Sequence, residues 1–337
     1  MNRSRVAKFF GRGGSFLAST VKYLFAIWIF GLIRYSGPFP DDSVFNTLLG
    51  IVWFAALLGV SFRIRHRRQE WLAILGLFLV PLAYYQFLRP SHNRDWEAPH
   101  GRTAYAEVSG DTVTIQNFRS FDYDADGLPV SQWETRSFDL ANLRAMDFFM
   151  THWDTEMAGH PIFSFDFGPQ GHFAFTIEAR MEKDESYSLL AGLYRRFETI
   201  YIPSEESDAV RVRTNFRKGE NVHIYRTIAT PEQARKRFME FISSMNEIRE
   251  KPRFYNIVTF NCTTAVRSQM NASFPMDWRV IFNGRLDELL YERGVLVTGG
   301  LPFDELKQRA FINPKSREHP EKEGFSERIR EGVPGFE

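Results

Sequence analysis

Residues 255–270 read YNIVTFNCTTAVRSQM and hold the only cysteine among the 337 residues of the chain. The β-branched and aromatic residues 257–260 predict a short strand. Residues 263–270 contain no Gly or Pro and predict a helix with Asn261 as its N-cap. Cys262 would then lie in the first helical turn, where unpaired backbone N–H groups and the helix dipole favour a thiolate and could hold an oxyanion. We therefore interpret Cys262 as a candidate nucleophile, although a lone cysteine is more often a small buried hydrophobic residue.

Three apolar runs lie near the N-terminus, at residues 16–33, 45–62 and 71–88. Each run would be about 27 Å long as a helix, close to the roughly 30 Å hydrocarbon core of a bilayer. Lys22 is the only charged residue in them, near an end where its ammonium group can reach the interface. Because three such runs follow one another across short polar loops, we expect three transmembrane helices within residues 1–90 rather than a cleaved signal peptide or buried soluble helices.

The basic residues predict the orientation of these helices. They are concentrated before the first run and after the second, at Arg3, Arg5, Lys8, Arg12, Arg63, Arg65, Arg67 and Arg68. Basic loops favour the cytoplasmic side, so the N-terminus is expected in the cytoplasm and everything after Arg89 outside it. In a bacterium this predicts an inner-membrane protein with a periplasmic C-terminal domain.

Residues 91–301 are expected to form one compact α+β domain. Helices are predicted at residues 186–196, 231–249, where Thr230 is the N-cap, and 278–291. The polar, Pro-containing residues 302–337 form a tail, and from residue 314 onward we expect it to be disordered. Strands are predicted at residues 103–108, 112–116, 131–138, 143–153, 160–167, 172–180, 198–202, 210–215 and 222–226.

Composition limits the classes of function. The chain is 44% hydrophobic and 25% charged with a formal net charge of +1, which argues against a nucleic-acid-binding or disordered protein. No His/Cys/Asp cluster has zinc-ligand spacing, and no GxxxxGK[ST] phosphate-binding motif occurs. We therefore expect no metal and no cofactor, and the oligomeric state stays open.

A thiol nucleophile needs a base, and the base needs an orienting partner. The Gly-Pro-Gln-Gly turn at residues 168–171 predicts a hairpin. A hairpin symmetric about this turn would place His160 opposite Ala179 and diagonal to Glu178, so that His160 and Glu178 would meet after a one-residue register shift such as a bulge. His172 is the main competing base, and His152 is a weaker one.

Several segments carry a resemblance to a known family. The segments GHPIFSFDF, FTIEARMEKDESYS, RTNFRKGENVHIYR and YNIVTFNCTTAVR, with DWE before them, resemble the Lnb N-terminal periplasmic domain family over residues 94–270, or as far as residue 301. That family is similar to circularly permuted papain-like (NlpC-type) cysteine enzymes, in which the histidine strand precedes the cysteine helix. The resemblance implies Cys262 as nucleophile, His160 as general base and then acid, and Glu178 as the residue that orients the imidazole, with Tyr255 and Asn261 as supports.

The resemblance also implies a function. Members linked to the Lnb name are lipoprotein N-acyltransferases, so a phospholipid would donate an acyl chain to Cys262 as a thioester, and the amino group of a lipoprotein would accept it. The three spans depart from this pattern and leave the substrate open. Two alternatives remain: an NlpC-type amidase or peptidase acting on peptide substrates of the cell envelope, and a non-catalytic binding module in which Cys262 is only packed.

Overall fold

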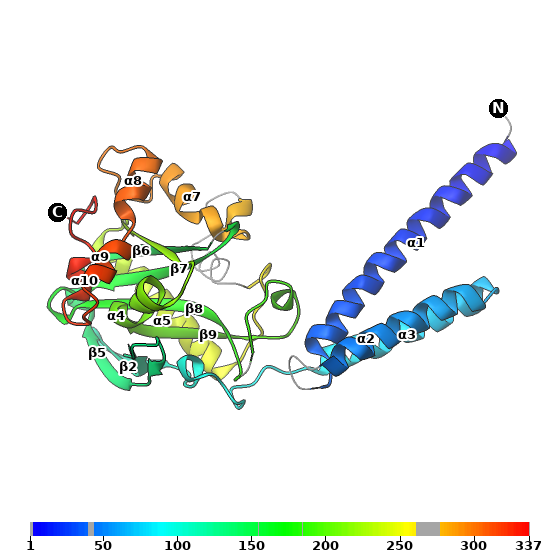
Figure 1. Ribbon diagram of the computed structural model, residues 1–337, viewed down its shortest axis with the longest axis horizontal. Helices are drawn as coiled ribbons and strands as arrows, with labels where there is room; N and C mark the ends of the chain where they lie inside the picture. The colour runs from blue at the N-terminus through cyan, green and yellow to red at the C-terminus, as the bar shows by residue number, and fades with distance from the viewer. Residues whose placement is uncertain (1–2, 40–43, 154, 184, 261–276, 337) are drawn as a thin grey trace. The chain divides into compact units, whose positions relative to one another are not determined.

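The structure is a computed structural model that describes residues 3–39, 44–153, 155–183, 185–260 and 277–336 (Figure 1). The predicted helix at residues 263–270, together with Cys262 and Asn261, lies outside the described residues. The chain divides into two compact units. One contains residues 1–90 and 185–197, and the other contains residues 91–184 and 198–337.

The first unit contains three long helices, α1 (Arg3–Ser36), α2 (Val44–Arg63) and α3 (Arg67–Phe87). By length and composition, α2 and α3 could each cross a membrane, and the first apolar run lies within α1, whose crossing stays a prediction. The helices share buried apolar residues, and the indole N–H of Trp53 donates to the carbonyl of Leu77 at 2.8 Å. Lys22 donates to Ser61 at 3.1 Å, so the only charge within the apolar runs has a polar partner.

The second unit is built on an eight-stranded mixed sheet, which confirms the predicted α+β class; the papain-like permutation stays a prediction. The strand order is β1-β2-β9-β8-β7-β6-β10, and β5 also pairs with β2. Asn117 has φ +56° where the β2–β5 register shifts, and its side chain bonds the carbonyl of Thr103 at 3.0 Å. The strands are β1 (Tyr105–Ser109), β2 (Thr112–Arg119), β5 (Trp133–Asp139), β6 (Ala145–Trp153), β7 (Thr155–Asp166), β8 (His172–Arg180), β9 (Glu198–Glu205) and β10 (Asn221–Arg226), with β3 (Asp122–Tyr123) and β4 (Pro129–Val130) as a separate pair.

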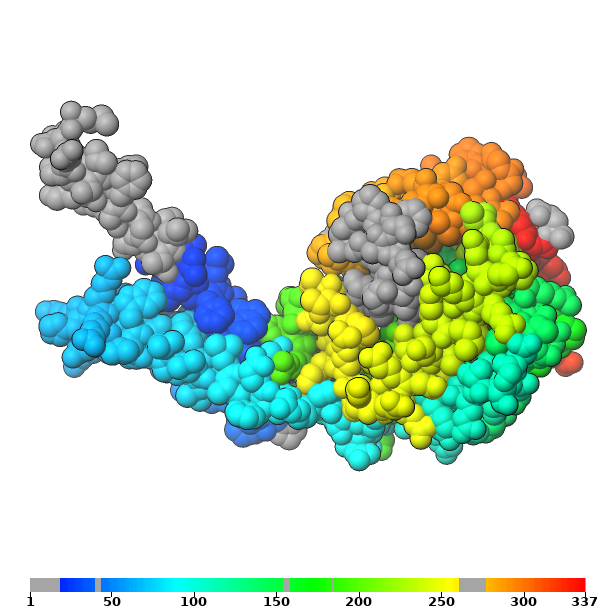
Figure 2. Space-filling model, turned by 180° about the vertical axis from the view of Figure 1, so that it is seen from behind, coloured from blue at the N-terminus to red at the C-terminus, as the bar shows by residue number. Residues whose placement is uncertain are grey.

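Alternate residues of the strands bury two different faces of the sheet. On one face, Phe165, Phe173 and Phe175 pack against Phe238 of α5 (Pro231–Glu250), with ring centroids 5.2–6.0 Å apart. This helix begins as the sequence predicts, with a capping box between Thr230 and Gln233. Figure 2 shows α5, in yellow-green and yellow, beside the teal β1–β2 hairpin. The short helices α7 (Leu286–Glu292) and α8 (Phe303–Ala310) contribute Leu286, Leu289 and Leu306 to the same core.

The opposite face is covered by short helices from distant parts of the chain. The helix α4 (Glu206–Ala209) lies against β8 and β9, and α9 (Asn313–Glu318) lies against β10 (Figure 1). The helix α10 (Phe325–Arg328) packs on α4 and α9. The apolar cluster on this face includes Phe149, Ile162, Ala174 and Ile224. His160 lies two residues before Ile162 on β7, so its side chain shares this face.

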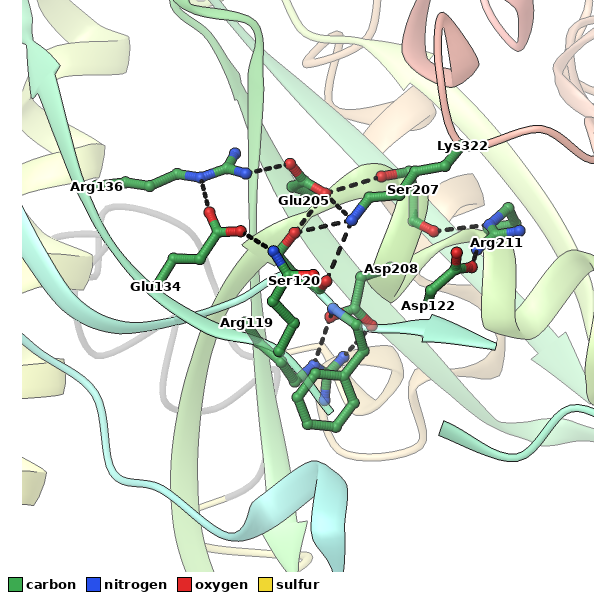
Figure 3. Close-up of polar contacts among 12 residues, drawn as sticks. Arg119, Ser120, Asp122, Glu134, Arg136, Glu205, Ser207, Asp208, Arg211 and Lys322 are labelled. Atoms are coloured by element: carbon green, nitrogen blue, oxygen red, sulfur yellow. Dashed lines mark hydrogen bonds and ion pairs between the residues drawn. The ribbon is translucent and has the colours of Figure 1, made fainter. Parts of the chain in front are cut away.

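The predicted disordered tail is wrong, because residues 314–336 fold against the sheet. Phe325, Ile329 and Val333 are buried at a spacing of four residues, which the polar composition around them concealed. Lys322 donates to the hydroxyl of Ser120 at 2.8 Å and pairs with Glu205 at 2.7 Å, beside the bidentate pair of Arg119 with Asp208 (Figure 3).

Arg330, in the same C-terminal segment, forms buried ion pairs with the rest of the domain. Its guanidinium group pairs with Asp147 at 2.7 Å and with Glu206 at 2.6 Å, and all three side chains are buried. Burial alone would raise the pKa of Glu206, but the charge of Arg330 outweighs it and lowers the pKa to about 2. The last residues of the described chain are therefore part of the domain core.

Four other predicted elements differ in the structure. The predicted helix at residues 278–291 consists of two 3-10 turns, Trp278–Val280 and Asn283–Arg285, before α7 begins at Leu286. Residues 186–196 form turns and one short 3-10 helix instead of an α-helix, and residues 210–215 pass from α4 into a π-helical turn (Val212–Phe216) instead of a strand. Residues 257–259 form a turn rather than a strand, because the side chain of Asn256 accepts from the backbone N–H groups of Val258 and Thr259 at 3.1 and 3.0 Å.

Candidate functional site

The β7–β8 hairpin brings His160 and Glu178 together. Its paired residues, from Phe163 with Phe175 to Asp166 with His172, have a register one residue different from the predicted one. If this register continues toward the start of β7, His160 lies opposite Glu178. The two residues therefore meet without the bulge that we expected. The Nε2 atom of His160 lies 3.7 Å from Oε1 of Glu178.

Thr176 links the two side chains. Its hydroxyl oxygen lies 2.8 Å from Nε2 of His160, and the hydroxyl donates to Oε1 of Glu178, also at 2.8 Å. A hydroxyl has only one proton, so Nε2 must be the donor in its bond with Thr176. The neutral imidazole therefore carries its proton on Nε2, and Nδ1 keeps the lone pair that a general base uses. Nδ1 has no hydrogen-bond partner within the part of the chain that the structure describes.

Glu178 is held as a carboxylate by several donors. Besides Thr176, a guanidinium nitrogen of Arg213 donates to Glu178 at 3.1 Å. Nε2 of His100 lies 3.3 Å from the other carboxylate oxygen, and it carries the proton because Nδ1 accepts from the backbone N–H of Met181. Burial by itself would raise the pKa of Glu178, but the hydrogen bond from His100 and the charge of Arg213 hold it well below its ordinary value.

Burial also sets the protonation of His160, which is 8% exposed. Loss of hydration and the nearby charge of Arg213 together lower its pKa to about 3, although the charge of Glu178 opposes the shift. The imidazole is therefore neutral near pH 7, and the lone pair on Nδ1 is available to accept a proton.

The remaining predicted site residues have different outcomes. Cys262 and Asn261 lie outside the described residues, and Tyr255 is buried beside the Asn256 turn. The structure adds three residues that we did not predict as parts of the site, Thr176, Arg213 and His100. Thr176 could have been found, since it lies two residues before Glu178 on the same face of a strand. The sequence predicts Arg213 on a strand and His100 before the first strand, and no local pattern connects either residue to Glu178.

The competing histidines lie elsewhere. His172 is paired with Asp166, six positions along β8 from Glu178 and therefore roughly 20 Å from it. His152 is on the opposite face of the sheet from His160, with Nε2 3.0 Å from Asp287. The hydroxyl of Tyr225 donates to the same oxygen of Asp287 at 2.9 Å.

The His152 cluster borders a cavity of about 710 Å³, which His223 and Lys307 also line. Burial lowers the pKa of His223 to about 3. Burial alone would raise the pKa of Asp287, but the hydrogen bond from His152 and nearby positive charge outweigh it, so the pKa is lowered to about 2. His152 therefore has a carboxylate partner of its own, as His160 does, and it is the competitor against which His160 has to be tested. No group of three His, Cys, Asp or Glu side chains in the described ranges is arranged to hold a metal ion.

Comparison with known families covers the part of the chain that contains this site. Residues 130–284 match the model of the Lnb N-terminal periplasmic domain family. The match covers less than half of the chain, and it shows that this stretch is similar to that family. The matched residues include His160, Thr176, Glu178, Arg213 and the position of Cys262. The match begins later than the expected residue 94, and it ends between the two expected ends at residues 270 and 301. Neither a curated protein nor a solved structure matches the chain.

The family match and the apolar helices are both consistent with a protein of the cell envelope. A periplasmic family domain that follows the apolar helices α2 and α3 fits a membrane protein with a periplasmic domain. The match thereby indicates a periplasmic, envelope-related domain.

Proposed function

We propose that this chain is a membrane-anchored cysteine acyltransferase in which His160 activates Cys262. The observation that carries the proposal is the hydrogen-bonded series His160–Thr176–Glu178, which fixes the proton on Nε2 and leaves Nδ1 as a base. A thiol nucleophile needs such an imidazole, and the imidazole needs a third group that orients it. The family match supports the pairing because the Lnb domain spans both residues.

The proposed reaction has two halves. Nδ1 of His160 takes the proton of Cys262 as the sulfur attacks the carbonyl carbon of a phospholipid ester, and the resulting imidazolium returns that proton to the departing alcohol. A thioester remains on Cys262. The amino group of a lipoprotein then attacks the thioester and loses a proton through His160, which restores the thiol and leaves an amide on the acceptor.

The electrostatics of the site suit this proton relay. The low pKa of His160 keeps it neutral before reaction, and a thiolate beside it would favour the imidazolium. Glu178 stays ionised and can stabilise the positive charge through Thr176. Both substrates are confined to a membrane surface, which suits an enzyme that carries its own membrane helices.

The test uses purified full-length protein in detergent, incubated with a phospholipid that carries a radiolabelled acyl chain. We expect label on the protein that hydroxylamine removes and that is lost in Cys262→Ser. The matched control is His160→Ala, which should accumulate much less label because the proton acceptor is gone. Absence of label in the wild-type protein, together with hydrolysis of envelope peptides, would replace acyl transfer by amidase activity.

A further inference from the structure

We infer that residues 185–197 form a membrane-docking loop whose leucines enter the outer leaflet of the bilayer. The loop lies between β8 and β9 in the chain, yet it belongs to the compact unit of the membrane helices. Its sequence, ESYSLLAGLYRRF, has three leucines within five residues. The partner that we assign to it is a phospholipid surface.

Tyr194 anchors the loop to α1. It is buried, its ring stacks on Tyr35 with centroids 5.5 Å apart, and its hydroxyl occupies the place that a side chain at Gly31 would fill. A Cβ atom at Gly31 would be only 1.9 Å from this hydroxyl, so the close approach requires glycine there.

Arg195 joins the loop to α3. Its guanidinium group donates to the carbonyl of Tyr85 at 2.5 Å and lies 4.4 Å from the centre of the Tyr85 ring. Arg196 pairs with Glu185 at 3.0 Å, which closes the base of the loop. The loop thus contacts two helices through side chains that are held in place.

These contacts fall at the level of a membrane interface. Tyr35 is the penultimate residue of α1 and Tyr85 lies two residues before the end of α3, so both lie at the same end of the helix group. The ring centroids of Trp28 and Tyr194 are 6.3 Å apart. Tyr and Trp side chains concentrate where a bilayer meets water. A loop fixed at that level extends the lipid-facing surface of the helices.

The leucines have the exposure that this position requires. Leu189 and Leu190 are 44% and 60% exposed. Apolar side chains at an interface are buried about 5–10 Å into the boundary between headgroups and acyl chains, with Arg or Lys beside them in the headgroup layer. Arg195, which is not fully buried, lies two residues after Leu193, so the loop has this arrangement.

The experiment places an environment-sensitive fluorophore on single cysteines in the full chain, reconstituted in nanodiscs, after Cys262 is replaced by serine. Labels at Leu189→Cys and Leu190→Cys should lose at least about half of their fluorescence to a lipid that carries a nitroxide near the top of its acyl chain. Leu128→Cys is the matched control, because this leucine is 62% exposed on the β3–β4 hairpin of the other unit. Unquenched labels at both loop positions would overturn the inference.

Two variants test the anchor. Gly31→Leu and Tyr194→Ala should each reduce the quenching at Leu190→Cys, because they remove the same contact from opposite sides. Gly59→Leu in α2 is the control, since a Cβ atom there meets nothing within 4 Å. Quenching that is unchanged in both anchor variants would overturn the docking role of Tyr194.

Discussion

Nε2 of His160 lies 3.7 Å from Oε1 of Glu178, and the hydroxyl of Thr176 bridges them. The bridge decides which imidazole nitrogen carries the proton, because the single hydroxyl proton already goes to the carboxylate. Because Thr176 bridges the two side chains, Glu178 can orient the imidazole of His160 without a direct hydrogen bond to it. The arrangement makes Thr176 a positioning residue whose hydroxyl can be tested separately from its shape.

Thr176→Val should lower kcat for acyl transfer by roughly 10-fold to 100-fold, the cost of a lost hydrogen bond to a charged network. The valine has nearly the same shape, so KM for the phospholipid should change little. Thr176→Ser restores the hydroxyl and should recover most of the rate. A normal kcat in Thr176→Val would show that Thr176 does not position His160.

Acid should destabilise the domain through His160. Its pKa is about 3 in the folded protein and about 6.5 when unfolded, so the unfolded state binds more protons between these values. The free energy of unfolding should therefore fall as pH falls below about 6.5, by up to about 1.4 kcal/mol per pH unit from this group. Glu178, whose pKa is held low, should add to the loss below its ordinary range.

Denaturant unfolding of the full chain in detergent between pH 4 and pH 7 measures this effect. His160→Gln removes the titrating group and should flatten the dependence of the unfolding free energy on pH. His319→Gln, at an exposed position, is the control. An unchanged slope in His160→Gln would mean that protonation of this residue is not linked to unfolding.

Arg330→Ala should destabilise the domain by about 3–5 kcal/mol, because Asp147 and Glu206 would lose a buried cationic partner. Arg309→Ala removes an exposed arginine whose partner, Glu305, lies four residues away on α8, and should cost about 0.5 kcal/mol or less. The midpoint of chemical denaturation gives both values. Equal midpoints for the two variants would show that the C-terminal segment does not stabilise the core.

The predicted orientation can be tested with a reporter enzyme that is active only outside the cytoplasm. Fused at the C-terminus, it should be active, because three spans carry the domain across the membrane. Fused in the loop between α2 and α3, at residues 64–66, it should be inactive. The opposite pattern would reverse the topology.

The strands and α5 could be predicted because their signals are local. Alternating apolar residues gave the β7 and β8 runs, and Thr230 with Gln233 marked the start of α5. The errors arose where one side chain or a distant contact decides the conformation. Asn256 turns residues 257–259 back on themselves, and Arg330 makes a polar segment part of the core.

The candidate site was predictable in part for the same reason. Hairpin symmetry brought His160 near Glu178, with a register one residue away from the observed one. His100 and Arg213 reach Glu178 from the chain before β1 and from the π-helical turn, and no local pattern connects these segments. The His152–Asp287 pair joins residues 135 positions apart, so it too depends on the fold.

The most direct test of the central claim is the rate at which Cys262 is alkylated near neutral pH in the wild-type protein, His160→Ala and His152→Ala. The account predicts that His160→Ala slows alkylation by about tenfold or more, because the thiolate loses its base, while His152→Ala reacts at nearly the wild-type rate. Equal rates in wild type and His160→Ala, or a loss confined to His152→Ala, would contradict it.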